Sequence, residues 1–325
     1  MKRRAWVAQV LGLCVLPVVG TAVADPQVRI GLLSPTSAAA NQARLATLRT
    51  ALAELGYEEG RNLLIEYRYA EGRFDRLPEM ARELAAAGAS PIIAINTPAA
   101  LAAVRMPGAT PVLFASVGDP VAVGLVRNLS RPGGKVSGTT NMARDLSKKR
   151  MQLLGEMLPS ARRLAVLTNP DDPVTASQEA DVRAAAPALG FDIRFFPVRE
   201  VAALPDTLKA AAEWRADAVL RIAEPLLTQH RAVLVRALLE HRLPAMMVTA
   251  PEVREGGLMS YFSLESEEYR TLAGYVDRVL KGASPANLPI QRPTRFDLVI
   301  NLATARSLGI AVPSALLLRA DEVIG

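Results

Sequence analysis

Residues 164–173 read LAVLTNPDDP: an apolar, strand-like run, a short polar step and then a proline. The same order occurs four more times, at PIIAINTP (91–98), VLFASVGDP (112–120), AVLRIAEP (218–225) and AMMVTAP (245–251). Proline suits the first position of a helix, because the amide donor that it lacks is unpaired there anyway. We therefore predict five helices that begin directly after strands, with Thr97, Asp119 and Asp172 as N-caps.

The rest of the chain also alternates between strand and helix patterns. Residues 63–69 alternate in the manner of a strand, and the spacing of the leucines in 41–55 predicts a helix that Gly56 ends. Strands separated by helices form βαβ crossovers, which give mainly parallel sheets. The sequence therefore predicts an α/β fold.

A stretch rich in Gly, Ser and Thr, RPGGKVSGTTN at 131–141, separates two similar halves of this alternation. We interpret it as the first passage between two lobes, and 256–263 as the second. The predicted organisation is one lobe over 25–141 and 264–283, and a second lobe over 142–263 and 284–325.

Composition fits two lobes with large buried cores. The chain has 325 residues, of which 50% are hydrophobic and 5% aromatic, and this suits buried parallel strands and argues against disorder. The formal net charge is +6, but residues 1–24 hold three basic residues and no acid, so the remainder carries +3. No basic stripe or polybasic patch indicates a nucleic-acid partner or a membrane surface.

The first 24 residues have the pattern of a cleaved secretory signal peptide. Three basic residues stand in 1–4, residues 5–20 are almost wholly apolar, and Ala22-Val23-Ala24 offers a cleavage site. The apolar stretch is short for a membrane span and Pro17 interrupts it. We therefore expect export to the periplasm, with an uncleaved anchor as the alternative.

Two other export routes have weaker support. Arg3-Arg4 is a partial twin-arginine signal, and Cys14 would anchor a lipoprotein if the preceding Leu13 were a small residue. Cys14 is the only cysteine and would leave with the signal peptide, so folding in an oxidising compartment would not depend on a disulfide.

No motif for catalysis or metal binding is convincing. His230 and His241 are the only histidines, and their spacing on one predicted helix does not suit a single metal ion. No G-x-S-x-G elbow occurs, and the GGK at 133–135 fails the Walker pattern at Leu129 and Val136. We expect no catalytic residue, no metal and no cofactor. Of the functions considered for this chain, an enzyme has the weakest support.

Polar side chains gather instead where the predicted strands end. That carboxyl edge is where open α/β sheets bind ligands, and helix starts there offer free amide donors. We expect hydroxyls and helix starts to hold a ligand carboxylate, and Asp119 or Glu224 to hold an amino group, although some of these side chains could only cap helices. The candidate ligand-binding residues are Ser34, Thr36, Asn96, Thr97, Ser116, Asp119, Asn141, Asn169, Asp171, Glu224 and Thr249.

Several stretches along the chain resemble one protein family. They are RIGLLS, ELGYEEGRNLLIEYRYAEGRFDRLPEMA, TPAALAA, SVGDPVAVGLV, LSRPGGKVSGTT, GGLMSY, PTRFDLVINLATARSLGI and ADEVIG. The chain resembles the family of periplasmic substrate-binding components of ABC transporters whose better-known members are similar to tryptophan- and tyrosine-binding proteins. The stretches most specific to this family are 56–62 and 116–120. The resemblance implies a type I periplasmic-binding fold, with two lobes, three hinge crossings and a ligand closed between them.

The chain departs from this family at three points near the expected ligand. Ile95-Asn96 replaces the usual Gly-Gly, Ala223-Glu224-Pro225 replaces Gly-Asp-Pro, and Thr249-Ala250-Pro251 stands where an aromatic residue is usual. Larger side chains on the cleft side predict a poor fit for an aromatic amino acid. Asn96 would then contact the ligand itself, or the ligand would be smaller.

The sequence therefore predicts a monomeric, soluble periplasmic protein that binds an amino acid or related carboxylate. It would close around the ligand by a hinge movement and deliver it to an ABC permease in the inner membrane. The alternative is a sensor that presents the same kind of ligand to a membrane receptor. A transcription-factor effector domain is disfavoured, because a signal peptide stands where a DNA-binding motif would be.

Overall fold

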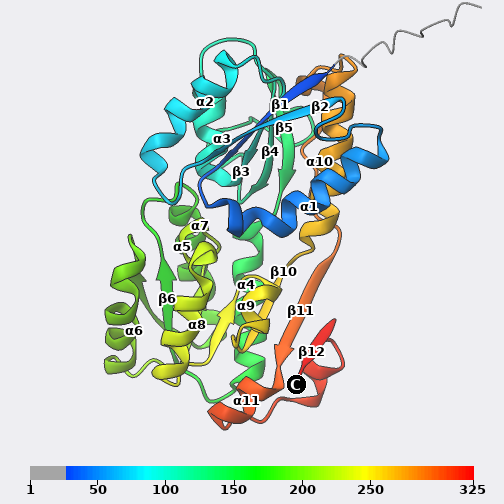
Figure 1. Cartoon of the computed structure of the whole chain (residues 1–325). Coiled ribbons are helices and arrows are strands. Elements are labelled where there is room, and N and C mark those ends of the chain that lie inside the picture. Colours follow the sequence, from blue (N-terminus) through cyan, green and yellow to red (C-terminus); the bar gives the residue numbers. More distant parts are fainter. Residues whose placement is uncertain (1–26) are drawn as a thin grey trace, which may run out of the picture.

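The structure, a computed structural model, describes residues 27–325, and the expected signal peptide lies outside them. Within these residues the chain forms two α/β lobes, one above the other in Figure 1. None of the helices there is long and apolar enough to span a bilayer. The predicted fold class is confirmed.

The first lobe is a five-stranded parallel sheet in the order β2-β1-β3-β4-β5. The strands are β1 (Val28–Ser34), β2 (Leu63–Tyr69), β3 (Ile92–Ile95), β4 (Val112–Val117) and β5 (Val136–Thr140). One face is covered by α1 (Ala38–Glu54) and α10 (Glu265–Leu280), and the other by α2 (Leu77–Ala86) and α3 (Asn96–Arg105). Ile30 and Leu32 face α1 while Leu33 faces α2, because side chains alternate across a strand. Both faces are buried, which explains why β3 and β4 are nearly continuous apolar runs.

The second lobe is a seven-stranded sheet in the order β12-β11-β10-β9-β8-β6-β7, parallel except between β10 and β11. Its strands are β6 (Arg163–Thr168), β7 (Asp192–Pro197), β8 (Ala218–Arg221), β9 (Ala245–Met247), β10 (Met259–Ser263), β11 (Phe296–Asn301) and β12 (Glu322–Ile324). Its helices are α4 (Ala143–Met157), α5 (Thr175–Ala185), α6 (Leu204–Glu213), α7 (Pro225–Gln229), α8 (Arg231–Glu240), α9 (Ala250–Arg254), α11 (Leu302–Leu308) and α12 (Ser314–Leu317). The helices α4 and α5 cover one face, and α6 and α8 the other.

The chain crosses between the lobes three times: after β5 at Met142, after β10 at Leu264, and after Gln291. Leu288 and Ile290 lie in the two cores of the first lobe, and Gln291 pairs with Thr139 of β5. We therefore propose that the second segment of the first lobe runs to 291 rather than to 283.

Helices follow strands in four of the five predicted units: at most three residues separate α3, α7 and α9 from the preceding strand, whereas six residues, 169–174, separate β6 from α5. After Asp119-Pro120 the prediction is wrong: residues 120–124 form a turn, in which Asp119 Oδ1 accepts from the Ala122 N–H at 2.9 Å. Thr97 is not an N-cap either, because α3 already begins at Asn96.

Two further predictions need correction. Five of the eleven residues at 131–141 are not part of a linker, because Val136–Thr140 forms β5 inside the first sheet and the crossing follows it. Asp172 accepts from the Val174 N–H at 3.1 Å but stands ahead of the residue that caps α5, which is Val174 itself.

Candidate ligand-binding cleft

A pocket lies between the lobes, where the carboxyl ends of β3, β4 and β5 face the starts of α5, α7 and α9. The cavity is small: the centre of a water molecule can reach about 30 Å³ of it. Six of the sequence-predicted residues line this pocket: Asn96, Thr97, Ser116, Asn141, Glu224 and Thr249.

The lobes touch each other around this pocket. The Ser37 N–H of the first lobe donates to Gln229 Oε1 of the second at 3.1 Å, and Asp119 Oδ2 lies 3.1 Å from Arg144 Nη1. Packing beside the pocket is also tight, since a Cβ on Gly118 would lie 2.7 Å from Val174 Cγ2. The cleft is therefore closed in this structure.

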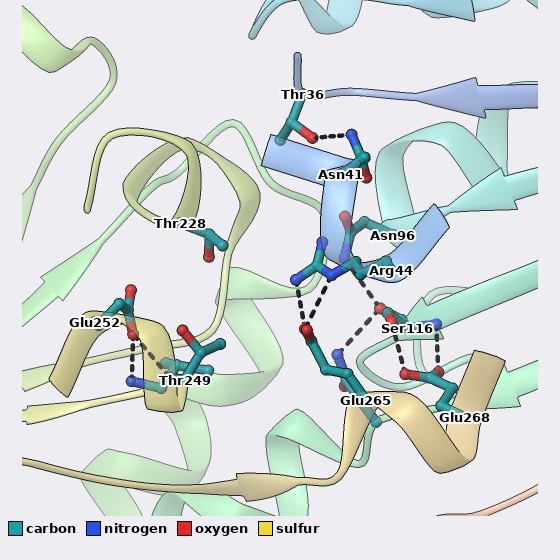
Figure 2. Close-up of polar contacts among 12 residues, drawn as sticks. Thr36, Asn41, Arg44, Asn96, Ser116, Thr228, Thr249, Glu252, Glu265 and Glu268 are labelled. Atoms are coloured by element: carbon teal, nitrogen blue, oxygen red, sulfur yellow. Dashed lines mark hydrogen bonds and ion pairs between the residues drawn. The ribbon is translucent and has the colours of Figure 1, made fainter. Parts of the chain in front are cut away.

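Three of the predicted site residues in the first lobe lie outside the pocket wall. Ser34 and Thr36 are buried and accept hydrogen bonds from Asn41 Nδ2 of α1, at 2.9 and 2.8 Å. Figure 2 shows the contact between Asn41 and Thr36. Asp119 joins the lobes through Arg144, as described above. These side chains fix the start of α1 and the closed arrangement rather than facing the pocket.

The two remaining predicted residues belong to the loop after β6. Asn169 donates through Nδ2 to Glu224 Oε2 at 3.2 Å, and so helps to position Glu224, which lines the pocket. Asp171 is half exposed and pairs with Arg199 at the surface, while its neighbour Asp172 lines the pocket.

Non-glycine residues with positive φ stand at or just after the ends of three adjacent strands, and two of them, Asn96 and Ser116, line the pocket. Asn96 has φ +64°, Ser116 +57° and Met142 +53°. Such conformations cost about 1–3 kcal/mol each and concentrate at ligand-binding sites. Asn96 stands where the family resemblance predicts glycine, and asparagine tolerates this conformation better than most residues.

Ser116 is held in place by a buried carboxylate behind the pocket (Figure 2). Glu268 of α10 accepts from the Ser116 N–H at 2.6 Å, from Ser116 Oγ at 2.7 Å and from Thr139 Oγ1 at 2.6 Å. Burial raises the pKa of Glu268, while these hydrogen bonds oppose the rise. The carbonyl of Ser116 also accepts from Asn141 Nδ2 at 3.1 Å, so the ends of β4 and β5 are tied together.

Sequence reasoning missed four polar pocket residues: Arg44, Asp172, Thr228 and Glu265. Arg44 reaches in from the middle of α1, and its Nη2 and Nε lie 2.5 and 3.0 Å from Glu265 Oε1 (Figure 2). A basic residue in the middle of a helix carries no sequence signal that distinguishes it from a surface residue. Asp172 was considered only as a cap.

The second lobe contributes two buried carboxylates to the pocket. Glu224 accepts from the backbone N–H groups of Leu226 and Leu227, and burial raises its pKa. Burial, reinforced by the nearby charge of Glu224, raises the pKa of Asp172 from its ordinary 3.8 to about 7, although the Val174 N–H stabilises the carboxylate. A pair of acids that are both costly to ionise suits a cationic group between them.

Asp172 should make stability depend on pH. Its pKa is higher in the folded protein than in the unfolded chain, so between about pH 4 and pH 7 the folded protein binds more protons and loses stability as the pH rises. Asp172→Asn removes this titration, and its unfolding midpoint relative to the wild type should therefore rise between pH 5 and pH 8. Thermal unfolding across this range measures the difference; a constant offset between the two proteins would contradict the assignment.

No group of three or more His, Cys, Asp or Glu side chains in residues 27–325 is placed to hold a metal ion. The polar groups of the pocket are suited to hydrogen bonds and charge pairing with a small molecule.

Two parallel-sheet lobes, three crossings and a polar pocket between them define a type I periplasmic-binding fold. Residues 29–324 match the model of the family described as ABC transporter substrate binding protein, so the chain belongs to this family of substrate-binding proteins of ABC-type transport.

Three relatives illustrate the similarity. The tyrosine-binding protein of Clostridioides difficile strain R20291 is 24% identical over 267 residues, which are 82% of this chain and 76% of the relative. The structure of an ABC domain from Streptococcus pneumoniae in complex with L-Trp has a TM-score of 0.85 and 24% identity, covering 92% of this chain and 100% of that one. A conserved domain protein from Vibrio cholerae has a TM-score of 0.87 and 26% identity, covering 91% and 99%.

Proposed function

We propose that the protein is the periplasmic solute-binding component of an ABC importer. It captures an amino acid or a related carboxylate between its lobes, closes around it by hinge movement and delivers it to a permease in the inner membrane. Membership of the substrate-binding family supports this role, as do relatives that are described with tyrosine or L-Trp.

The observation that carries the ligand class is the division of charge across the pocket. Arg44 lies on the first-lobe side, where it pairs with Glu265, and the buried carboxylates of Asp172 and Glu224 lie on the second-lobe side. An amino acid has one charge of each sign on neighbouring atoms. Its carboxylate would bind Arg44, and its ammonium group the two acids, so that the ligand itself links the lobes.

Native mass spectrometry of residues 25–325, purified without refolding, tests the ligand class directly. We expect an amino acid at about one per chain, or, if the protein is purified free of ligand, stabilisation by one. An amino acid at about 100 times its dissociation constant should add about 2.7 kcal/mol to the free energy of unfolding. If no amino acid or carboxylate stabilises the protein, the ligand class is wrong.

Arg44→Met should weaken amino-acid binding about 10- to 100-fold, because a hydrogen bond to a charged group contributes about 1.5–3 kcal/mol. The matched control is Arg49→Met on the same helix, where Arg49 pairs with Glu59 at the exposed surface, away from the cleft. Isothermal titration calorimetry should show unchanged affinity for the control. Equal affinities of the two variants would contradict the role of Arg44.

A further inference from the structure

A groove lined by both lobes is separate from the ligand pocket and has no role in the function proposed above. It measures about 300 Å³ by the space that the centre of a water molecule can reach, and small-molecule sites commonly begin at about this volume. No residue of its wall also lines the pocket. The groove lies where α2 and α3 stand above α5 in Figure 1, and we call it the rim groove.

The wall of the rim groove is largely apolar and comes mainly from the first lobe. Leu77, Leu101 and Met106 line it and belong to the buried core of that lobe, and Phe74 packs against the same core. Removing apolar surface from water is favourable, so the apolar part of a small molecule would be stabilised against these side chains.

Two guanidinium groups stand in this apolar wall. Arg82 of α2 and Arg105 at the end of α3 line the rim groove, and neither side chain forms an ion pair or a hydrogen bond with another of the residues 27–325. Asp171, the one acid among the described residues of the wall, pairs with Arg199. The rim groove therefore carries an excess of positive charge, which a carboxylate would complement.

The pocket and the rim groove lie on opposite sides of two shared segments. At the start of α3, Thr97 lines the pocket and the next residue, Pro98, lines the rim groove. In the loop before α5, Asp172 lines the pocket, whereas Asp171 and Pro173 on either side of it line the rim groove. Because α3 belongs to the first lobe and this loop to the second, a molecule in the rim groove would contact both lobes beside the pocket.

A molecule that contacts both lobes binds the closed arrangement better than an open one, since opening would withdraw Asp171 and Pro173 from α3. Such a difference in affinity shifts the protein toward the closed arrangement. An occupied rim groove would therefore raise the affinity of the pocket for its own ligand, and the pocket ligand would raise the affinity of the rim groove by the same factor.

We propose that the rim groove is a second binding site, for a small carboxylate with an apolar body, and that its occupancy favours closure of the lobes. The carboxylate pairs with Arg82 and Arg105, and the apolar body covers Phe74, Leu101 and Met106. The coupling rests on the proposed function, because it acts on the same hinge movement, whereas the site itself does not.

Isothermal titration calorimetry with octanoate tests the site. Ala102→Trp places a large side chain in the rim groove from α3 and should weaken octanoate binding at least 10-fold. Ala86→Trp, at the exposed end of α2 and outside the walls of the groove and the pocket, is the matched control and should bind octanoate as the wild type does. Equal affinities of the two variants, or no binding of octanoate to the wild type, would overturn the site.

The arginines are tested without changing the shape of the groove. Arg82→Met and Arg105→Met should each weaken octanoate binding about 2- to 5-fold, the range for exposed ion pairs, and leave the binding of uncharged 1-octanol unchanged. Arg76→Met is the matched control, because Arg76 is exposed and adjoins Leu77 in sequence but lies outside the wall. If 1-octanol binds as tightly as octanoate, or if all three variants lose equally, these arginines do not select a carboxylate.

A further titration tests the coupling and separates it from the proposed function. Saturating octanoate should raise the affinity of the wild type for the amino acid that it binds at least 5-fold, and should have no such effect in Ala102→Trp. An unchanged affinity in the wild type would overturn the coupling. If the wild type binds no amino acid, the proposed function fails, whereas the difference between the wild type and Ala102→Trp toward octanoate still decides the site.

Discussion

Glu252→Gln is expected to lower the free energy of unfolding by about 3–5 kcal/mol, the usual cost of removing one partner from a buried ion pair. Glu252 and Arg221 are both fully buried, with Glu252 Oε1 3.1 Å from Arg221 Nε. The other carboxylate oxygen accepts from the backbone N–H groups of Val248 and Thr249, at 2.9 and 2.8 Å (Figure 2). One side chain therefore compensates a buried cation and caps the start of α9.

A second buried arginine increases the loss of stability that we expect for Glu252→Gln. Arg150 of α4 is completely buried, and none of its three side-chain nitrogens has a hydrogen-bond partner among residues 27–325. Burial and the charge of Arg221 lower the pKa of Arg150 to about 9, against the attraction of Glu252, so the guanidinium is still charged at neutral pH. Without Glu252, the buried Arg221 and Arg150 would lose the carboxylate that attracts both of them.

Urea unfolding of Glu252→Gln and of a control, Glu255→Gln, measures this cost. Glu255 caps the same helix but forms an accessible ion pair with Arg231 at 2.5 Å, and such pairs contribute at most about 1 kcal/mol. The double variant Glu252→Gln/Arg221→Met should lose less than the sum of its single variants, because it removes both charges of the pair. Equal losses for the two glutamine variants would show that Glu252 does not compensate the buried cations.

The sequence predicted where the pocket lies better than it predicted which residues line the pocket. Apolar runs followed by proline indicated where strands end and helices begin, and the pocket lies at those strand ends. Which of two neighbouring polar residues faces inward depends on the turn between strand and helix, as Asp171 and Asp172 show: one lies at the surface and the other lines the pocket. Arg44 was beyond sequence reasoning altogether, because its role depends on α1 packing across the cleft from the second lobe.

Gly138 also has a structural role that the sequence alone does not reveal. The stretch 131–141 suggested a flexible linker, yet Gly138 lies inside β5, paired with Phe114 of β4. The reason for this glycine is a close approach of two backbones, which only the register of the sheet reveals. The residue type identified the position as special, but its physical role follows from a strand distant in sequence.

Gly138→Ala is therefore expected to cost about 3 kcal/mol or more, as forced overpacking does at its upper end. A Cβ at this position would lie 2.0 Å from the carbonyl oxygen of Phe114 and 2.7 Å from its amide nitrogen, and φ is +149°. Because the obstacle is backbone, relief requires β5 to move away from β4. That movement would pull Thr139 from Glu268 and Asn141 from the Ser116 carbonyl, so any folded variant should also bind its ligand more weakly.

The same substitution at Gly274 should have the opposite sign. Gly274 lies in the middle of α10, and an added Cβ would meet no atom within 4 Å outside the neighbouring backbone of its own helix. Alanine restricts the unfolded chain more than glycine does and favours helix, so Gly274→Ala should raise the free energy of unfolding by about 0.4–1 kcal/mol. Both changes add one methyl group at a glycine, and both can be measured in the same urea titration. If both variants lose stability by similar amounts, close backbone contact with β4 is not what requires glycine at position 138; opposite signs would leave the geometry of the β4–β5 pair as the cause.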